Sequence, residues 1–146
     1  MPKGIYIRTK NSLNRKLISG ESSFNHLYNN YRWHAMQRDI DFLLSKEEFR
    51  ALTSKDCVYC GEKPKKSHQT KHNYTTKDGN KKSVTSNGEY KYNGIDRVDN
   101  TKSYTIENCV TCCYVCNYMK RTMSVSEFQN HITKIFNWME HNEKNE

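Results

Sequence analysis

The chain of 146 residues has no long apolar segment. No run of apolar residues approaches the roughly 18–20 that a helix needs to cross a bilayer. Residues 1–10 also lack the apolar stretch of a secretory signal. We therefore expect neither a membrane protein nor a secreted one. We expect a protein of the cytoplasm or nucleus, where reducing conditions leave cysteines free to bind metals.

The chain is also poor in hydrophobic residues, which make up only 34% of it. Little apolar surface is thus available for a core, and in small domains a bound metal often supplies the missing stabilisation. Six Cys and six His make a metal cross-link the predicted solution. The length suits one compact domain with an extended arm better than two separate cores.

Acidic residues are too few to balance the basic ones. Lys and Arg number 24 and Asp and Glu 16, so the formal charge is +8, which favours a polyanion as partner. Residues 1–20 hold five basic and no acidic residues, and residues 62–92 hold eight Lys and three acids. We predict a basic arm at 1–20, with a solubilising tail as the alternative, and a polar basic insertion at 62–92, either a loop or a ragged hairpin.

An amphipathic helix is predicted over residues 24–39, with Ser22 or Ser23 as its N-cap. Its apolar positions follow helical spacing: Phe24, Leu27, Tyr28, Tyr31 and Ala35. Further along, residues 95–98 and 108–112 have the pattern of two strands joined by a turn, which predicts a β-hairpin. The pattern becomes helical again from about Cys116.

Two Ser-x-x-Glu capping boxes predict further helix starts. Residues 45–48 (Ser-Lys-Glu-Glu) precede a short helix that ends before Cys57. Residues 124–127 (Ser-Val-Ser-Glu) open a C-terminal helix over 124–141. Its apolar face comprises Phe128, Ile132, Ile135, Phe136 and Met139.

The cysteines form Cys-x-x-Cys pairs. Cys57 and Cys60 are one pair, and the glycine that follows them lets the backbone turn beneath a metal. Two partner pairs have the same spacing, Cys109 with Cys112 and Cys113 with Cys116. On a strand at 108–112 the first pair would point to opposite faces, so we favour the second. We predict a structural Zn²⁺ bound by Cys57, Cys60, Cys113 and Cys116, with His68 and His72 as rival ligands.

Residues 94–121 read GIDRVDNTKSYTIENCVTCCYVCNYMKR. This stretch resembles the HNH, or ββα-metal, endonucleases, particularly the zinc-braced phage and mobile-element type. The matching features are the Ile-Asp-Arg-x-Asp strand, the Tyr-Thr-x-x-Asn approach to the second strand and the Cys-x-x-Cys-Asn-x-Met-Lys turn. The resemblance implies an α+β fold with a small ββα-metal core at 93–123, a four-cysteine zinc site and flanking helices, in one nuclease domain over 21–146. It also suggests a virus or mobile element as the source.

The resemblance implies metal-dependent hydrolysis of phosphodiester bonds in double-stranded DNA. Asp96 and Asn117 would hold the catalytic cation, Mg²⁺ or another divalent ion, because hard cations prefer oxygen ligands. Asn108 would hydrogen-bond across the hairpin and keep the active loop in shape. Lys120 and Arg121 would contact backbone phosphates.

One position departs from the family pattern. The residue after the metal-binding Asp is usually a His that acts as general base, but here it is Arg97, which cannot accept a proton at neutral pH. Arg97 is instead expected to clamp the scissile phosphate, as in family members that carry the same Asp-Arg variant. His34 is the leading candidate for the base, with Tyr59 and His26 as weaker ones and a metal-bound water alone as a further alternative.

Two other functions stay open. A catalytically silent, zinc-stabilised DNA-binding module would share every feature except turnover, and an RNA-directed nuclease would share the chemistry. Since one active site cuts one strand most simply, we expect a double-strand cutter to form a homodimer.

Overall fold

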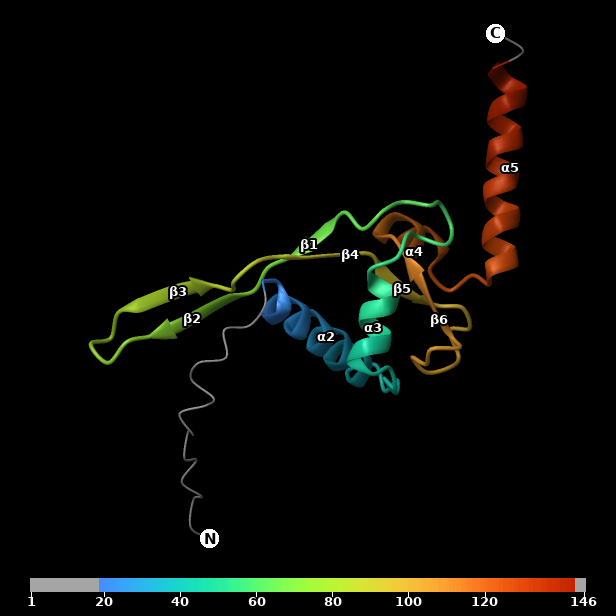
Figure 1. Cartoon of the computed structure of the whole chain (residues 1–146). Helices are drawn as coiled ribbons and strands as arrows, with labels where there is room; N and C mark the ends of the chain where they lie inside the picture. Colours follow the sequence, from blue (N-terminus) through green and yellow to red (C-terminus); the bar gives the residue numbers. More distant parts are fainter. Residues whose placement is uncertain (1–18, 144–146) are drawn as a thin grey trace. The chain divides into compact units, whose positions relative to one another are not determined.

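The computed structural model describes residues 19–143 (Figure 1). Of the predicted basic arm, residues 1–18 lie outside the described residues. In chain order the elements are α2 (Glu21–Met36), α3 (Lys46–Thr53), β1 (Lys66–His68), β2 (Lys71–Thr75), β3 (Lys81–Thr85), β4 (Tyr90–Tyr92), β5 (Gly94–Arg97), β6 (Cys109–Cys112), α4 (Tyr114–Lys120) and α5 (Val125–Glu143). The strands pair two by two, as β1–β4, β2–β3 and β5–β6.

The chain divides into two compact units. The first contains residues 19–26 and 68–90, and the second contains residues 27–67 and 91–143. Most of the predicted 62–92 insertion therefore belongs to the first unit, which also takes the first residues of α2.

The insertion contains a regular hairpin. β2 and β3 pair antiparallel, from Lys71 opposite Thr85 to Thr75 opposite Lys81 (Figure 1). The turn between them closes through a hydrogen bond from the Thr76 N–H to the Asn80 carbonyl, 2.9 Å long. Of the two structures considered for this segment, a loop or a hairpin, the hairpin is the one observed.

The start of α2 differs from the prediction. The helix begins at Glu21, so Ser22 and Ser23 lie inside it and the N-cap prediction is wrong. The Ser23 hydroxyl instead donates to the Gly88 carbonyl at 2.8 Å. This tertiary contact had no signal in the local sequence. At its other end α2 stops at Met36, three residues before the predicted end.

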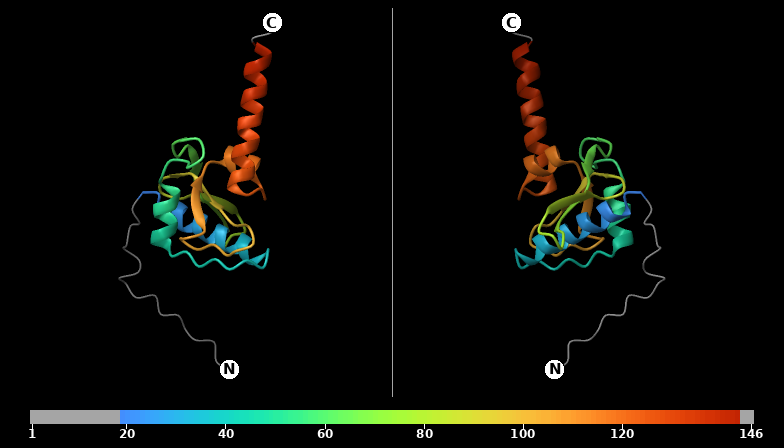
Figure 2. Two further views of the ribbon diagram at one scale, coloured as in Figure 1. Left: turned by 90° about the vertical axis from the view of Figure 1, so that its right-hand side faces the viewer. Right: turned by 90° about the vertical axis from the view of Figure 1, so that its left-hand side faces the viewer.

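The second unit is built around the predicted β5–β6 hairpin. The two strands are antiparallel, with Asp96 opposite Val110. α3 lies beside this pair (Figure 2), and the hydroxyl of Thr111 on β6 donates to the Leu52 carbonyl on α3 at 2.6 Å. The aromatic core next to them centres on Phe49, which is fully buried and packs its ring against those of Tyr28, Tyr31 and Phe42. The Ser45–Glu48 capping box of α3 is confirmed, with both of its hydrogen bonds present.

Two helices follow the hairpin. α4 starts at Tyr114, two residues before the predicted position, because Cys113 is its N-cap. The predicted capping box of α5 is confirmed, since the Ser124 N–H donates to Glu127 Oε2 (2.8 Å) and the Glu127 N–H donates to Ser124 Oγ (3.2 Å). β5, β6 and α4 thus form a ββα unit in the predicted order, within the predicted α+β fold.

The apolar face of α5 is mostly uncovered. Only Phe128 is buried, and it packs edge-on against the Tyr59 ring, 5.5 Å between centres. The other members of the face, and Trp138 beside them, are exposed: Ile132, Ile135, Phe136, Trp138 and Met139. Despite this apolar surface, no helix within residues 19–143 is long and apolar enough to cross a membrane.

Candidate metal centre and catalytic face

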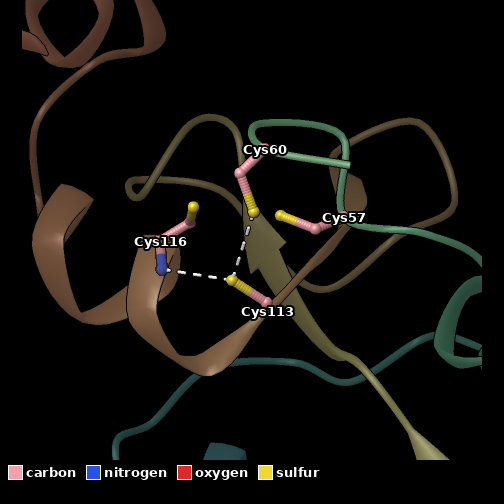
Figure 3. Close-up of side chains that lie close together, drawn as sticks. All are labelled: Cys57, Cys60, Cys113 and Cys116. Atoms are coloured by element: carbon pink, nitrogen blue, oxygen red, sulfur yellow. Dashed lines mark hydrogen bonds between the residues drawn. The ribbon is translucent and has the colours of Figure 1, made fainter. Parts of the chain in front are cut away.

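Four cysteines from two distant segments converge (Figure 3). The sulfur atoms of Cys57, Cys60, Cys113 and Cys116 all lie within 4.8 Å of one another, and those of Cys60 and Cys113 are 3.7 Å apart. A tetrahedral zinc with Zn–S bonds of about 2.3 Å requires sulfur–sulfur separations of about 3.8 Å. The donor set and its spacing therefore fit a structural zinc, and the structure brings together the four cysteines that the sequence predicted as its ligands.

Local backbone geometry explains the convergence. Gly61 has φ +74°, which a glycine adopts without strain, and its N–H donates to the Cys57 carbonyl at 2.8 Å. Two short turns carry the cysteines: the first knuckle is residues 57–61 and the second is residues 113–116. The Val58 N–H donates to the Thr111 carbonyl at 3.0 Å, which ties the first knuckle to β6. Burial raises the pKa of the Cys57 thiol, but backbone N–H groups of the two knuckles outweigh it and lower that pKa to about 7. The thiolate, the form that binds metal, therefore forms more readily there than at an ordinary cysteine.

The other two cysteines stay outside the cluster. Cys109 and Cys112 are buried on β6. Burial raises the pKa of Cys109 to about 12, so it remains a thiol. Across residues 19–143 no second group of three or more His, Cys, Asp or Glu side chains comes together in this way.

Asp96 is held at the interface of β5 with α4 and the first knuckle. Its Oδ2 accepts a hydrogen bond from the Tyr59 hydroxyl at 2.8 Å and lies 3.1 Å from the Lys120 ammonium. The side chains of Asp96 and Lys120 are both buried, with exposed fractions of 2% and 0%. The carboxylate is thus paired with a cation that the chain itself supplies.

These contacts correct two expectations. Lys120 has no exposed surface with which to contact DNA, because its ammonium is buried in the ion pair with Asp96. Tyr59 is unsuited to act as a base, because burial and the neighbouring Asp96 raise the pKa of its hydroxyl, which donates its proton to that carboxylate. Tyr59 instead orients Asp96.

Asn117 lies one turn before Lys120 on α4, the helix that packs on β5. Its Nδ2 is 3.5 Å from the carbonyl oxygen of Ile95, the residue that precedes Asp96. The structure therefore brings Asn117 and Asp96 to the same helix–strand contact. Their oxygen donors suit a hard divalent cation, and the site already holds one positive charge at Asp96. A divalent ion bound by Asp96 would have to displace the Lys120 ammonium.

The loop between β5 and β6 is held by Asn108. Its Oδ1 accepts from the Asp99 N–H at 2.9 Å, and its Nδ2 donates to the carbonyls of Asp99 and Ser103, each at 3.0 Å. Arg97 borders this loop, where its Nη1 donates to the Lys102 carbonyl at 2.5 Å. Asn108 thus fixes the loop on which Arg97 depends for its position.

The remaining predicted residues lie at the surface. His34 is exposed on the last turn of α2, with its ring edge-on to that of Trp33. Arg121 is exposed at the C-terminal end of α4, with φ +48°. His26 belongs to the first unit, where its Nδ1 lies 2.9 Å from Nε2 of His68.

Two residues that lie close to Arg97 were not identified in the sequence analysis. The guanidinium of Arg38 donates to the hydroxyl of Tyr104 at 2.8 Å, and Arg97 lies over the same ring. Arg38 stands outside every recognised motif, and the motif that contains Tyr104 indicates only the approach to a strand, so no local pattern marks either residue.

Comparison with known proteins identifies the type of fold that this chain adopts. No protein-family model matches the chain. The chain is 35% identical over 94 residues, 64% of its length, to uncharacterized protein R423 of Acanthamoeba polyphaga mimivirus, and it spans 13% of that protein's length. Its structure is similar to that of PacI, a rare-cutting HNH restriction endonuclease, with a TM-score of 0.50, 20% identity and coverage of 85% of this chain and 88% of PacI. The chain has an HNH-like fold. In this HNH-like fold β5, β6 and α4 form the ββα unit, and the four-cysteine cluster joins the start of α4 to the first knuckle.

Proposed function

We propose that the chain is a metal-dependent HNH endonuclease that hydrolyses phosphodiester bonds in double-stranded DNA. The observation that carries this proposal is the ββα unit itself, with Asp96 and Arg97 on β5 and Asn117 on the helix that packs against it. The likeness to PacI supports the fold, and the net charge of +8 suits a polyanionic substrate.

The proposed roles follow from chemistry and position. Asp96 and Asn117 hold a divalent cation, Mg²⁺ or another, which when bound stabilises negative charge on the leaving oxygen. Arg97 clamps the scissile phosphate through its planar fork of donors. His34 accepts the proton of the attacking water, because it sits on the exposed last turn of α2, the turn whose carbonyl bonds Arg38 beside Tyr104 and Arg97. Asn108 holds the loop.

Further partners are part of the same proposal. Arg121, exposed at the end of α4, contacts backbone phosphates, and so do the lysines of the β2–β3 hairpin in the first unit. For double-strand cutting we propose a homodimer that pairs α5 with α5. Ile132, Ile135 and Met139 follow heptad spacing on that helix, and the exposed Phe136 and Trp138 flank them. Within the described length of α5 these heptad positions carry no charged side chain that would oppose a second copy.

Two observations favour the second candidate, a catalytically silent DNA-binding module. The Asp96 carboxylate is buried and neutralised by Lys120, and the usual basic His is replaced by Arg97. Such a module would bind DNA without cutting it.

The test is conversion of supercoiled plasmid by the zinc-loaded chain with and without Mg²⁺. Nicked or linear product that depends on Mg²⁺ supports the nuclease. Binding without product under Mg²⁺, Mn²⁺ and Ca²⁺ supports the silent module. A single-stranded RNA substrate in the same assay separates an RNA-directed nuclease, which would cut the RNA and spare the plasmid.

A further inference from the structure

Two arginines from distant parts of the sequence meet at one tyrosine. The guanidinium carbon of Arg97 lies 5.0 Å from the centre of the Tyr104 ring, and that of Arg38 lies 5.9 Å from it. Arg38 also donates to the Tyr104 hydroxyl at 2.8 Å. Tyr104 is only 7% exposed, so its ring is a fixed support beneath both cations.

Backbone hydrogen bonds set the place of Arg38. α2 ends in a Schellman motif, in which the Ile40 N–H donates to the Ala35 carbonyl (3.0 Å) and the Asp39 N–H donates to the Met36 carbonyl (3.1 Å). Asp39 has the required left-handed conformation, φ +54°. Arg38 is therefore fixed at the C-cap of the helix.

The same backbone stretch holds Tyr104. The Tyr104 N–H donates to the Asp41 carbonyl and the Leu43 N–H donates to the Tyr104 carbonyl, both at 2.9 Å. Phe42, between them, forms a β-bridge with Tyr104 and packs against its ring. The segment that follows α2 thus carries both Arg38 and the support for the ring on which it rests.

No acidic side chain neutralises this pair of cations. Within residues 19–143 neither guanidinium forms an ion pair, and their hydrogen bonds go to oxygens of His34, Tyr104 and Lys102. Asp99, the acid of the neighbouring loop, pairs with Lys102 at 3.1 Å instead. Each guanidinium has five N–H donors, so both keep donors for an anion, and an anion would relieve their mutual repulsion.

We propose that Arg38, together with Arg97 and Tyr104, forms a binding site for phosphate groups of the DNA backbone. The guanidinium fork matches phosphate oxygens in pairs, which a lysine cannot do. Phosphate contacts fix the register of the strand and carry no sequence information. Arg38 thus positions the substrate whatever its sequence. The site rests on the proposed function for the identity of its ligand, duplex DNA.

The experiment measures binding in the absence of Mg²⁺. The affinity of the zinc-loaded full chain for a duplex of about 20 base pairs is followed by fluorescence anisotropy between about 50 and 200 mM salt. Log affinity falls with log salt, and each lost phosphate contact makes this fall shallower by about 0.9. At about 0.1 M salt that change corresponds to about an eightfold loss of affinity. We expect this change for Arg38→Gln and for Arg97→Gln, and a return to the wild-type slope for Arg38→Lys, which restores the charge.

Arg32→Gln is the matched control. Arg32 is on the same helix, and its guanidinium also lies over a tyrosine, 5.8 Å from the centre of Tyr28. The second cation at that ring is the Lys46 ammonium, at 5.9 Å, and not an arginine. The slope for Arg32→Gln should change by less than half as much. An unchanged slope for Arg38→Gln, an equal change for Arg32→Gln, or no binding by the wild type overturns the site. Arg38 is exposed, so its variants should fold, which circular dichroism checks.

The two proposals can fail separately. If the wild type binds with the predicted slopes but never cuts plasmid, the nuclease is refuted and the phosphate site stands. If the chain cuts plasmid while Arg38→Gln binds with the wild-type slope, the site is refuted and the nuclease stands.

Discussion

The ammonium of Lys120 lies 3.1 Å from Oδ2 of Asp96, and both side chains are buried. Burying two charges is costly unless each satisfies the other, and removing one leaves the partner uncompensated. The pair spans α4 and β5, so it also locks the helix of the ββα unit against the strand that carries the Asp-Arg motif.

Asp96→Ala should lower the free energy of unfolding by about 3–5 kcal/mol, because it leaves the Lys120 ammonium buried and unpaired. The double variant Asp96→Asn/Lys120→Met, which removes both charges and keeps similar volumes, should recover most of that loss. Urea unfolding of the zinc-loaded variants measures both changes. A double variant as unstable as Asp96→Ala would show that the ion pair is not the cause.

Bound zinc should be required for folding. The wild type should carry one zinc per chain by elemental analysis, and a chelator should unfold it, because the four thiolates join the first knuckle to the start of α4. Cys116→Ser should lose the zinc and the fold. Cys109→Ala, which removes a buried thiol outside the cluster, should keep the zinc. A zinc-free wild type with an unchanged circular dichroism spectrum contradicts the assignment.

Local signals in the sequence predicted the parts of this fold that depend on neighbouring residues. Both capping boxes depend on residues three apart, and both form as predicted. The choice of Cys113 and Cys116 followed from strand alternation, another local rule. The β5–β6 hairpin was likewise marked by its own residues and turn.

Tertiary contacts could not be predicted from such local patterns. Ser23 bonds Gly88 across 65 residues and so is not a cap, and Lys120 turns inward to Asp96 although its place in the motif suggested DNA. Arg38 reaches Tyr104 only because the chain after α2 pairs with the loop that precedes β6. Each of these depends on where two distant segments meet, which no periodicity encodes.

Asn108→Ala tests the loop that borders Arg97. The Asp99 N–H loses its acceptor, so its hydrogen exchange should accelerate by at least about tenfold, as expected for the loss of a bond worth about 1.5 kcal/mol. The Val98 N–H bonds the backbone carbonyl of Asn108, which the substitution retains, and provides the internal control. Equal acceleration at both amides would mean that the whole hairpin opens and that the side chain has no specific role.

Self-association tests the proposal that the exposed apolar face of α5, here called the stripe, pairs two copies of the chain. Light scattering should find a dimer at high protein concentration, and Ile135→Glu should shift it to monomer because a charge enters the heptad seam. Thr133→Glu adds the same charge two residues away, off the stripe, and should leave the dimer intact. A wild type that is monomeric at every concentration rules out pairing through α5.

Our central claim is that the Asp96 carboxylate holds the cation on which cleavage depends. The most direct test compares plasmid nicking by Lys120→Met with that by Asp96→Asn/Lys120→Met, under Mg²⁺ and with zinc bound. Both variants lack the buried ammonium, and they differ only in the carboxylate. We predict that Lys120→Met still nicks and that the double variant is slower by at least about a hundredfold, the scale of losing a contact of about 2.7 kcal/mol to the transition state. Equal nicking rates in the two variants would contradict the claim.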